Sequence, residues 1–503
     1  MRLPPLSLLL LLQIVVSAAS LVVEIVAGRM LAPYVGMSLY TWTSVIAVVL
    51  AGFSAGHWLG GRIAEQTAGR ALYLTGLWIM GAAITTAGAV LALRLGAPLL
   101  LPLTTNPVVA IVGLTTIAFF LPSFCAGVPA PVLAQISVAA QPDQSGRALG
   151  AMFAAGALGA IGGTLAAGFL FIAWLGSVGT LAAVTISYVA MALLCFALAA
   201  QAGHKVGLVM PALVTILTLA LAGTALAQPD PCTEESHYFC IRTEDASNDP
   251  NFPIRLMVLD HLVHGLSARD EPTVMFYPSA AMIDLISRTR MGRTDFDVLL
   301  IGGGTFSLPR AWAAQVPPAR VTVAEIDPEV TAVAARDFWW DPATARVLTQ
   351  DGRMTLSREA ATYDVIVGDA FTDIAVPPHL VTREFFDLVQ SRLAPNGVYL
   401  MNVIDHADRM QALAALVHTL DQVFPSVEIW TEARRPEPGE RMIFILAAGQ
   451  TPTPVNVLDG RSPDPTRFAK MPDRVKARLL ADRNPPVLTD DYAPIDRLIG
   501  QSY

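Results

Sequence analysis

Long runs of apolar residues, separated by short polar breaks, fill the first 228 positions of the chain. Each run is long enough for a helix to cross the hydrocarbon layer of a membrane, which is roughly 30 Å thick. The first run begins like a signal peptide but continues through Glu24, so we expect a retained helix. The pattern predicts about seven membrane spans, at residues 6–27, 39–59, 71–92, 107–128, 148–173, 177–200 and 206–227.

Small residues recur every four positions within two of these runs. In lipid, such a stripe lets two helices pack closely, and we prefer this interpretation to a transport pathway. The two series are Gly52, Gly56 and Gly60, and Gly156, Ala160, Thr164 and Gly168.

Two ionisable residues, Glu24 and His57, are expected at membrane depth, where charged side chains are costly and often functional. Arg29 follows Glu24 by five residues and is a candidate partner near the membrane edge. We favour a structural ion pair over a substrate or proton site.

After residue 228 the pattern changes from long apolar runs to short strands, turns and helices. Residues 254–260 and 274–277 are predicted strands of a small β subdomain. From Asp295 onward strands alternate with helices, which is typical of a parallel sheet. The predicted domains are a transmembrane helical bundle (1–228), the small β subdomain (229–290) and a Rossmann-like, methyltransferase-type α/β domain (291–503).

Charge divides the chain at the same place. Residues 1–228 hold seven Lys or Arg and three Asp or Glu, whereas residues 229–503 hold 26 basic and 38 acidic residues. The acidic half argues against nucleic acid as a partner and is compatible with a cationic substrate, although simple solubility is the explanation we favour for the acidity.

The short loops between the predicted spans indicate an orientation. Five basic residues fall on one side and two, Arg29 and Arg94, on the other, which favours an inside N-terminus. Seven spans then place the C-terminal half outside. Cys232 and Cys240 could form a short-loop disulfide there, since disulfides need an oxidising compartment. No His/Cys cluster has zinc spacing, so we expect no metal.

Candidate chemistry gathers where the predicted parallel strands end. Gly302, Gly303 and Gly304 follow the first strand, and Glu325 ends the second, 23 residues after Gly302. In nucleotide-binding sheets, an acidic residue at about this distance binds ribose hydroxyls. Asp351 and Asp369 follow the third and fourth strands, so three carboxylates should face one crevice. Asp also caps helices, and we accept that role for one of the three. The five strands are predicted at residues 296–301, 320–326, 346–349, 363–369 and 398–403.

Taken together, these residues resemble the spermidine synthase family of aminopropyltransferases. The matching motifs are IGGG (301–304), VAEIDP (323–328), QDGR (350–353), YDVIVGDAF (363–371), PPHLVTREFF (377–386) and LAPNG (393–397). Upstream, LDHLVH (259–264) is similar to part of that family's N-terminal β domain. The segments VEIVAGRMLAP (23–33) and GHWLGGR (56–62) resemble the subset fused to a multi-spanning membrane domain.

The resemblance implies decarboxylated S-adenosylmethionine as co-substrate and a diamine, usually putrescine, as acceptor. It implies that Glu325 holds the ribose and that Asp351, Gly352 and Pro377 line the nucleoside pocket, with Asp369 as proton acceptor. The implied location is the cell membrane, with the lipid bilayer as partner and a homo-oligomer allowed. The candidates on the substrate side are His264, Tyr277, Thr305, Thr372, Asp373 and His379.

Two departures from the family pattern leave the reaction open. Thr305 stands after the glycines where the family usually has Asp, and Thr372 replaces a second Asp, with Asp373 one position later. Loss of the first carboxylate favours an alternative enzyme that uses intact S-adenosylmethionine to transfer a methyl or aminocarboxypropyl group. A second alternative is a non-catalytic or transport-linked module that binds a polyamine or nucleoside.

The segment LTDDYAPID (488–496) contains Asp490, Asp491 and Tyr492. It could fold back over the crevice and help hold an amine. A solvated surface turn is the interpretation we favour.

Overall fold

The computed structural model describes residues 3–104, 106–207, 209–371 and 376–500. The chain forms two compact units, residues 1–240 and residues 241–503, which are described separately below.

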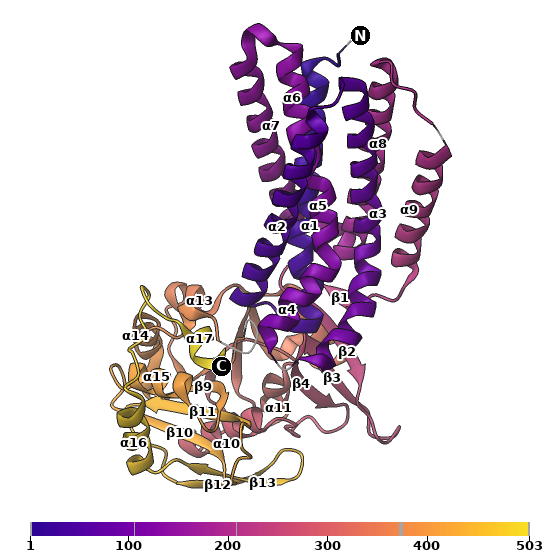
Figure 1. Ribbon diagram of the computed structural model, residues 1–503. Coiled ribbons are helices and arrows are strands. Elements are labelled where there is room, and N and C mark those ends of the chain that lie inside the picture. Colours follow the sequence, from indigo (N-terminus) through magenta and orange to yellow (C-terminus); the bar gives the residue numbers. More distant parts are fainter. Residues whose placement is uncertain (1–2, 105, 208, 372–375, 501–503) are drawn as a thin grey trace. The chain divides into compact units, whose positions relative to one another are not determined.

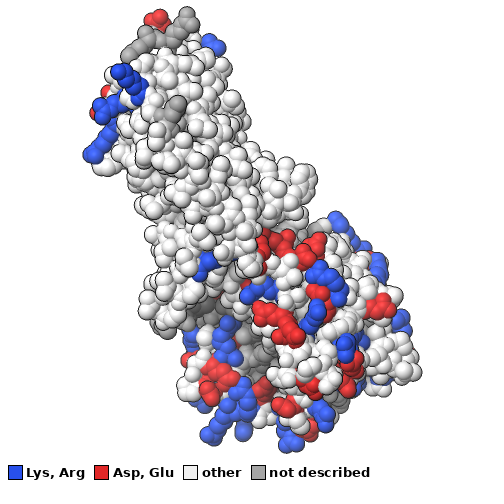
Figure 2. All heavy atoms as spheres, turned by 90° about the vertical axis from the view of Figure 1, so that its right-hand side faces the viewer, with Lys and Arg blue, Asp and Glu red and all other residues white. Residues whose placement is uncertain are grey.

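The N-terminal unit is a bundle of apolar helices (Figure 1). Between its two ends, the visible face of the bundle carries almost no Lys, Arg, Asp or Glu (Figure 2). Its elements are α1 (Leu6–Val35), α2 (Leu39–Ala64), α3 (Ala68–Leu100), η1 (Leu101–Leu103), α4 (Pro107–Thr115), η2 (Thr116–Phe120), α5 (Leu121–Gly127), α6 (Pro129–Ala140), η3 (Pro142–Gln144), α7 (Ser145–Ala166), η4 (Ala167–Phe171), α8 (Ile172–Gln201), α9 (Val209–Ala227) and the short strand β1 (Glu234–Glu235).

Six helical stretches of the described chain are long and apolar enough to cross a membrane. The fifth, Pro142–Gln201, is 60 residues long and contains two of the predicted spans. Gly176 breaks it with a left-handed backbone (φ 67°), and the chain reverses direction between α7 and α8 (Figure 1). The difference between seven predicted runs and six continuous stretches therefore arises at this single glycine.

The predicted close packing of small residues is confirmed for the first series. A Cβ atom on Gly56 would lie 2.2 Å from the carbonyl oxygen of Phe124, and one on Gly60 would lie 2.3 Å from that of Val128. Only glycine allows α2 to approach the α5–α6 backbone this closely.

The second series is only partly correct. Gly156 contacts Gln13, but nothing lies within 4 Å of a Cβ atom built on Gly168. The glycines that meet the α1 backbone are Gly159 and Gly163. A four-residue step exceeds the 3.6 residues of a helical turn, so a long series of such steps rotates away from the contact face.

The predicted Glu24–Arg29 ion pair is wrong. Arg29 instead lies 3.9 Å from Glu235 (Nε to Oε1) and donates to the carbonyl oxygens of Ser236 (2.8 Å) and Tyr238 (2.6 Å). Five residues along a helix place two side chains on different faces, whereas the segment after α9 returns to α1. The predicted disulfide between Cys232 and Cys240 is confirmed and closes this segment.

The C-terminal unit begins with three antiparallel strands, β2 (Cys240–Asp245), β3 (Ile254–Leu259) and β4 (Leu262–Ala268). The predicted strand at 254–260 is confirmed, but residues 274–277 form no strand. They instead lead into α10 (Pro278–Met291), where Pro278 occupies the first helical position that favours proline.

A nine-stranded mixed sheet follows, and its parallel part confirms the five predicted strands. The order is β12-β13-β10-β11-β9-β8-β5-β6-β7, in which β5 to β9 are parallel and the remaining strands pair antiparallel. The strands are β5 (Asp297–Ile301), β6 (Arg320–Glu325), β7 (Ala345–Thr349), β8 (Tyr363–Gly368), β9 (Leu393–His406), β10 (Ser426–Glu432), β11 (Arg441–Gly449), β12 (Val457–Arg461) and β13 (Pro465–Lys470).

Helices cover both faces of this sheet (Figure 1). They are α11 (Ser307–Ala313), α12 (Pro328–Asp337), η5 (Pro342–Thr344), α13 (Gly352–Arg358), η6 (Pro378–Leu380), α14 (Arg383–Arg392), α15 (Gln411–Leu420), α16 (Asp473–Arg483) and α17 (Ile495–Gly500). The chain winds from β5 through β6 to β7 and then returns to β8 on the other side of β5. Such a reversal opens a crevice at the carboxyl ends of β5 and β8, where ligands of open parallel sheets bind.

Candidate functional site

The glycine loop after β5 lies directly against the end of β8. Gly302 has φ +96°, and a Cβ atom there would lie 2.4 Å from the carbonyl oxygen of Asp369. The amide of Asp369 donates to Ile301 O (2.9 Å), and the amide of Gly302 donates to Ala324 O (3.0 Å). The loop is therefore held by both neighbouring strands. A side chain at position 302 would collide with the backbone of Asp369, so only glycine fits there.

Glu325, at the end of β6, is directed at this loop. Its carboxylate is 6% exposed and accepts from the amides of Gly303 (2.7 Å) and Asp327 (2.9 Å). Burial raises the pKa of Glu325, and these two amide donors oppose that rise. The sequence prediction that Glu325 and the glycines form one feature is supported by these contacts.

Asp351 caps the next helix. Its Oδ1 accepts from the amide of Met354 (3.0 Å) in the first turn of α13, and its Oδ2 lies 2.7 Å from Nε2 of His379. The hydrogen bond from His379 lowers the pKa of Asp351. Of the three predicted carboxylates, Asp351 is the one with a helix-capping role, and Gly352 follows it as the first residue of α13.

Asp369, after β8, is the predicted carboxylate with the least polar surroundings. Its Oδ1 accepts from Nδ2 of Asn402 on β9 (2.9 Å), and burial raises the pKa of Asp369 against the effect of this bond. Asn402 is 6% exposed, and its Oδ1 has no hydrogen-bond partner among the described residues. Sequence reasoning missed Asn402, although a lone amide in the apolar strand VYLMNV was a signal for it.

The strand β4 packs on the other side of the glycine loop. The carbonyl oxygen of His264 lies 3.4 Å from a Cβ atom built on Gly304, and a Cβ atom on Gly265 would lie 2.5 Å from Oγ1 of Thr305. Burial lowers the pKa of His264. Two of the substrate-side candidates, His264 and Thr305, are thus brought to the loop.

The Thr305 side chain is turned toward β4 and α11. It is 3% exposed, and its hydroxyl lies 2.6 Å from that of Ser307, which also bonds to Ser267 (3.1 Å) and to the carbonyl oxygen of Leu266 (3.2 Å). The Thr305 hydroxyl therefore ties the loop to the small sheet.

The remaining candidates are dispersed. Pro377 precedes η6, which presents His379 to Asp351. Tyr277 lies just before α10, and within the described residues its hydroxyl makes no hydrogen bond to the glycine loop. Thr372 and Asp373 lie outside the described residues.

The segment near residue 490 folds back beside α13. The carboxylate of Asp490 receives two bonds from Arg353 (2.7 and 2.6 Å), and Arg353 also donates to the carbonyl oxygen of His379 (3.1 Å). Asp490 is therefore already paired with a cation, and residues 489–492 form the exposed surface turn that we favoured.

Three features meet in the crevice at the strand ends. They are the backbone amides of the glycine loop, the buried carboxylate of Glu325 and the carboxylate of Asp369. Glycine amides and Glu325 can hold a hydroxylated, nucleoside-like group. Asp369 can accept a proton from a donor placed beside it. In the part of the chain that the structure describes, no three His, Cys, Asp or Glu side chains gather in a way that could hold a metal.

Part of the C-terminal unit is similar to a known protein family. Residues 291–456 match the family described as spermine/spermidine synthase domain. A "Probable polyamine aminopropyl transferase" of Bifidobacterium longum is 33% identical over 152 residues, which are 30% of this chain and 34% of that protein. The chain thus spans about a third of that relative's length.

One relative matches over a longer range. "Polyamine aminopropyltransferase 2" of Streptomyces coelicolor is 24% identical over 381 residues, or 67% of each chain. This share is larger than the C-terminal unit provides, so the similarity extends into the helical bundle. A crystal structure of a probable spermidine synthase from Corynebacterium glutamicum aligns with 52% of this chain and 96% of its own, at 20% identity and a TM-score of 0.43.

The glycine loop, Glu325, Asp351 and Asp369 all lie within the matched residues. The chain therefore carries, in residues 291–456, a domain of the spermine/spermidine synthase family, which is a family of transferases.

Proposed function

We propose that this protein is a membrane-anchored aminopropyltransferase that moves an aminopropyl group from decarboxylated S-adenosylmethionine to a diamine such as putrescine. The observation that carries the proposal is the Asp369 carboxylate, which is bound by Asn402 at the strand reversal, where the backbone of Asp369 meets Gly302.

The chemistry needs little from the protein beyond alignment and a base. An amine nitrogen attacks the methylene carbon bonded to the sulfonium, the new C–N bond forms as the C–S bond breaks, and sulfur retains the electron pair. The products are methylthioadenosine and the extended amine. An alkylamine is almost wholly protonated at neutral pH, so a carboxylate beside it attracts the amine and accepts its proton. We assign this role to Asp369.

The residues present fit a cationic nucleoside and a cationic acceptor. Glu325 and the loop would hold the ribose, and Asp351 with Gly352 and Pro377 would line the base. The buried Oδ1 of Asn402 is an acceptor without a donor among the described residues, which suits an ammonium group. We propose that this oxygen and Asp369 contact the same amine.

A second reaction is favoured by one observation. No carboxylate follows the glycine loop, since Thr305 stands there and its hydroxyl is bonded to Ser307. A loop without that charge would repel the carboxylate of intact S-adenosylmethionine less strongly. Transfer of a methyl or aminocarboxypropyl group from that co-substrate is therefore the alternative.

We also propose that the helical unit spans the bilayer seven times, with the segment Pro142–Gln201 crossing twice around Gly176. The two ends of the unit would then lie on opposite sides of the membrane. The Cys232–Cys240 disulfide supports an outside position for the segment after α9.

Product analysis by mass spectrometry tests the reaction. Purified full-length protein is incubated with putrescine and either decarboxylated or intact S-adenosylmethionine. Methylthioadenosine and spermidine in the first arm alone are expected. Products from intact co-substrate alone would establish the alternative reaction, and tight binding of either nucleoside without any product would favour a binding role.

A reporter enzyme that is active only outside the cell, fused after residue 503, tests the orientation. Activity is expected, and a silent but expressed fusion would place the C-terminal unit inside.

A further inference from the structure

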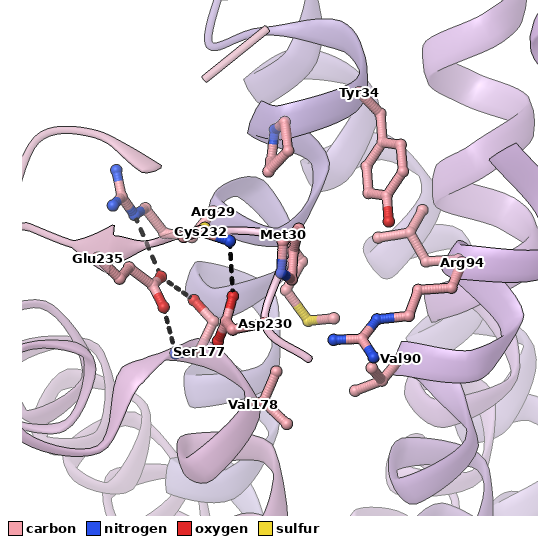
Figure 3. A pocket seen from close by; sticks show the side chains of 13 residues that line it. Arg29, Met30, Tyr34, Val90, Arg94, Ser177, Val178, Asp230, Cys232 and Glu235 are labelled. Carbon is pink, nitrogen blue, oxygen red and sulfur yellow. Dashed lines mark hydrogen bonds and ion pairs between the residues drawn. The ribbon is translucent and has the colours of Figure 1, made fainter. Parts of the chain in front are cut away.

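The end of the bundle beside the Cys232–Cys240 disulfide contains a cavity that the proposed transferase chemistry does not use (Figure 3). It is partly open to solvent. Its walls come from the C-terminal turns of α1 and α3, the start of α8 after Gly176, and the segment after α9. Met30, Val90, Leu93 and Val178 are among its apolar lining residues.

Two of the four charged groups in the cavity neutralise each other. Glu235 accepts from the backbone amide of Ser177 (2.8 Å) and from its hydroxyl, and Arg29 lies against Glu235 and two backbone carbonyls. These bonds fasten the segment after α9 to the bundle. Because the charges of Arg29 and Glu235 cancel, this pair offers no net charge to a ligand.

The other two charged groups are uncompensated. Arg94 extends into the cavity toward Met30 (Figure 3), and within the described chain its guanidinium has no hydrogen bond or ion pair. Asp230 accepts one bond, from the amide of Cys232 (2.9 Å). A guanidinium carries five donors in a planar fork that matches a phosphate, so the half-buried Arg94 is suited to an anion.

The surroundings of Arg94 point to a lipid as the source of that anion. The span predicted at residues 71–92 ends two residues before Arg94, and the neighbouring Leu95 is 70% exposed. In a bilayer, Arg94 would then lie at the depth where the acyl region gives way to headgroup phosphates.

We propose that this cavity binds the headgroup of a zwitterionic phospholipid that carries a primary amine, with the phosphate on Arg94 and the ammonium beside Asp230. The proposal rests on the membrane-spanning assignment of the helical unit and is independent of the transferase reaction. A soluble phosphate ester with a primary amine has the same charges, so the test must separate the two sources.

Native mass spectrometry of the full-length protein in detergent, titrated with phospholipids of ethanolamine, choline or glycerol headgroup, tests the proposal. The wild-type protein should retain the ethanolamine lipid best. Arg94→Gln should weaken retention of all three lipids by about tenfold, the loss of one charge-assisted contact. Asp230→Asn should remove only the preference for ethanolamine over choline.

Two further variants keep the result interpretable. Arg147→Gln, at the exposed start of α7, makes the same chemical change away from the cavity and should bind lipid normally. Arg94→Lys keeps the positive charge but lacks the planar guanidinium, so it should retain part of the lipid binding. Wild-type affinity in Arg94→Gln would overturn the proposal.

A separate arm uses soluble phosphoethanolamine as competitor. The lipid should bind far more tightly, and equal affinity would show that the site takes a free phosphate ester instead. Failure of the wild-type protein to enter vesicles would disprove the membrane assignment, whereas normal insertion with unselective lipid retention would disprove only the headgroup site.

Discussion

In the helical bundle, Gly56 and Gly163 keep a helical backbone, and each lies where a Cβ atom would collide with a carbonyl oxygen of another helix. In the C-terminal unit, Gly302 adopts φ +96° and turns the chain between two strands. The bundle thus uses glycine to shorten the distance between elements, whereas the sheet uses it to shape a loop. The same residue type therefore indicates packing in one unit and a shaped loop, the proposed binding site, in the other.

Buried polar groups differ in the same way. In the bundle, Ser20, Thr75 and Thr115 donate to carbonyl oxygens four residues earlier in their own helices. In the C-terminal unit, Glu325 and Asp369 accept bonds from other segments of the chain. A hydroxyl satisfied within its own helix stabilises that helix. A carboxylate held between elements is available for chemistry.

The largest effect should come from removing the carboxylate that the sheet places in the crevice. Asp369→Asn keeps the size of the side chain but cannot accept a proton, so turnover should fall about 10²–10⁴-fold. Turnover is measured as methylthioadenosine release. Asp387→Asn, on the exposed face of α14, is the matched control and should keep full activity. Full turnover in Asp369→Asn would refute the proposed base.

Replacing a glycine of the bundle by alanine should reduce the stability of the bundle only where that glycine contacts another helix. A Cβ atom on residue 163 would lie 2.3 Å from the carbonyl oxygen of Ala18, whereas nothing lies within 4 Å at residue 162. Gly163→Ala should therefore destabilise the bundle by about 1–3 kcal/mol. Gly162→Ala should be neutral or slightly stabilising, because alanine favours helix. Thermal unfolding in detergent measures both, and equal losses would show that the contact face is misassigned.

The pH dependence of turnover should report the bond between Asn402 and Asp369. That bond favours the ionised form and opposes the rise that burial causes in the pKa of Asp369. Its removal in Asn402→Leu should raise this pKa further, and activity needs the ionised form. The acid limb of the rate profile should therefore move to higher pH, by about one unit if the bond contributes about 1.4 kcal/mol.

The conservative variant Asn402→Gln keeps an amide and should restore part of the shift. A loss of turnover without any movement of the acid limb would mean that Asn402 only packs against β8. In that case Asn402 would have only a structural role, as the buried hydroxyl groups of the bundle do.

The sequence predicted the parallel strands because each is a short apolar run bounded by turn residues. It also predicted the disulfide. It could not predict Asn402 as the partner of Asp369, since that contact depends on β9 lying beside β8. The partner of Arg29 was missed for the same reason, because Glu235 is more than 200 positions away.

The smallest effect should come from the ion pair that holds the C-terminal segment beside α13. Two bonds from Arg353 lower the pKa of Asp490 to about 2, below its usual value near 3.9. This contribution to stability is present above the usual value and is lost as the pH falls through about 2. Both side chains are partly exposed, so Asp490→Asn should cost at most about 1 kcal/mol.

Hydrogen exchange at neutral pH measures this change locally. Residues 488–496 should exchange faster in Asp490→Asn, while Asp491→Asn, one position away, should leave them unchanged. Turnover should fall little, because Asp490 holds the segment in place rather than contacting the amine. A large fall in turnover with unchanged exchange would instead make Asp490 part of the binding site. The crevice would then use a carboxylate that Arg353 releases when the substrate enters.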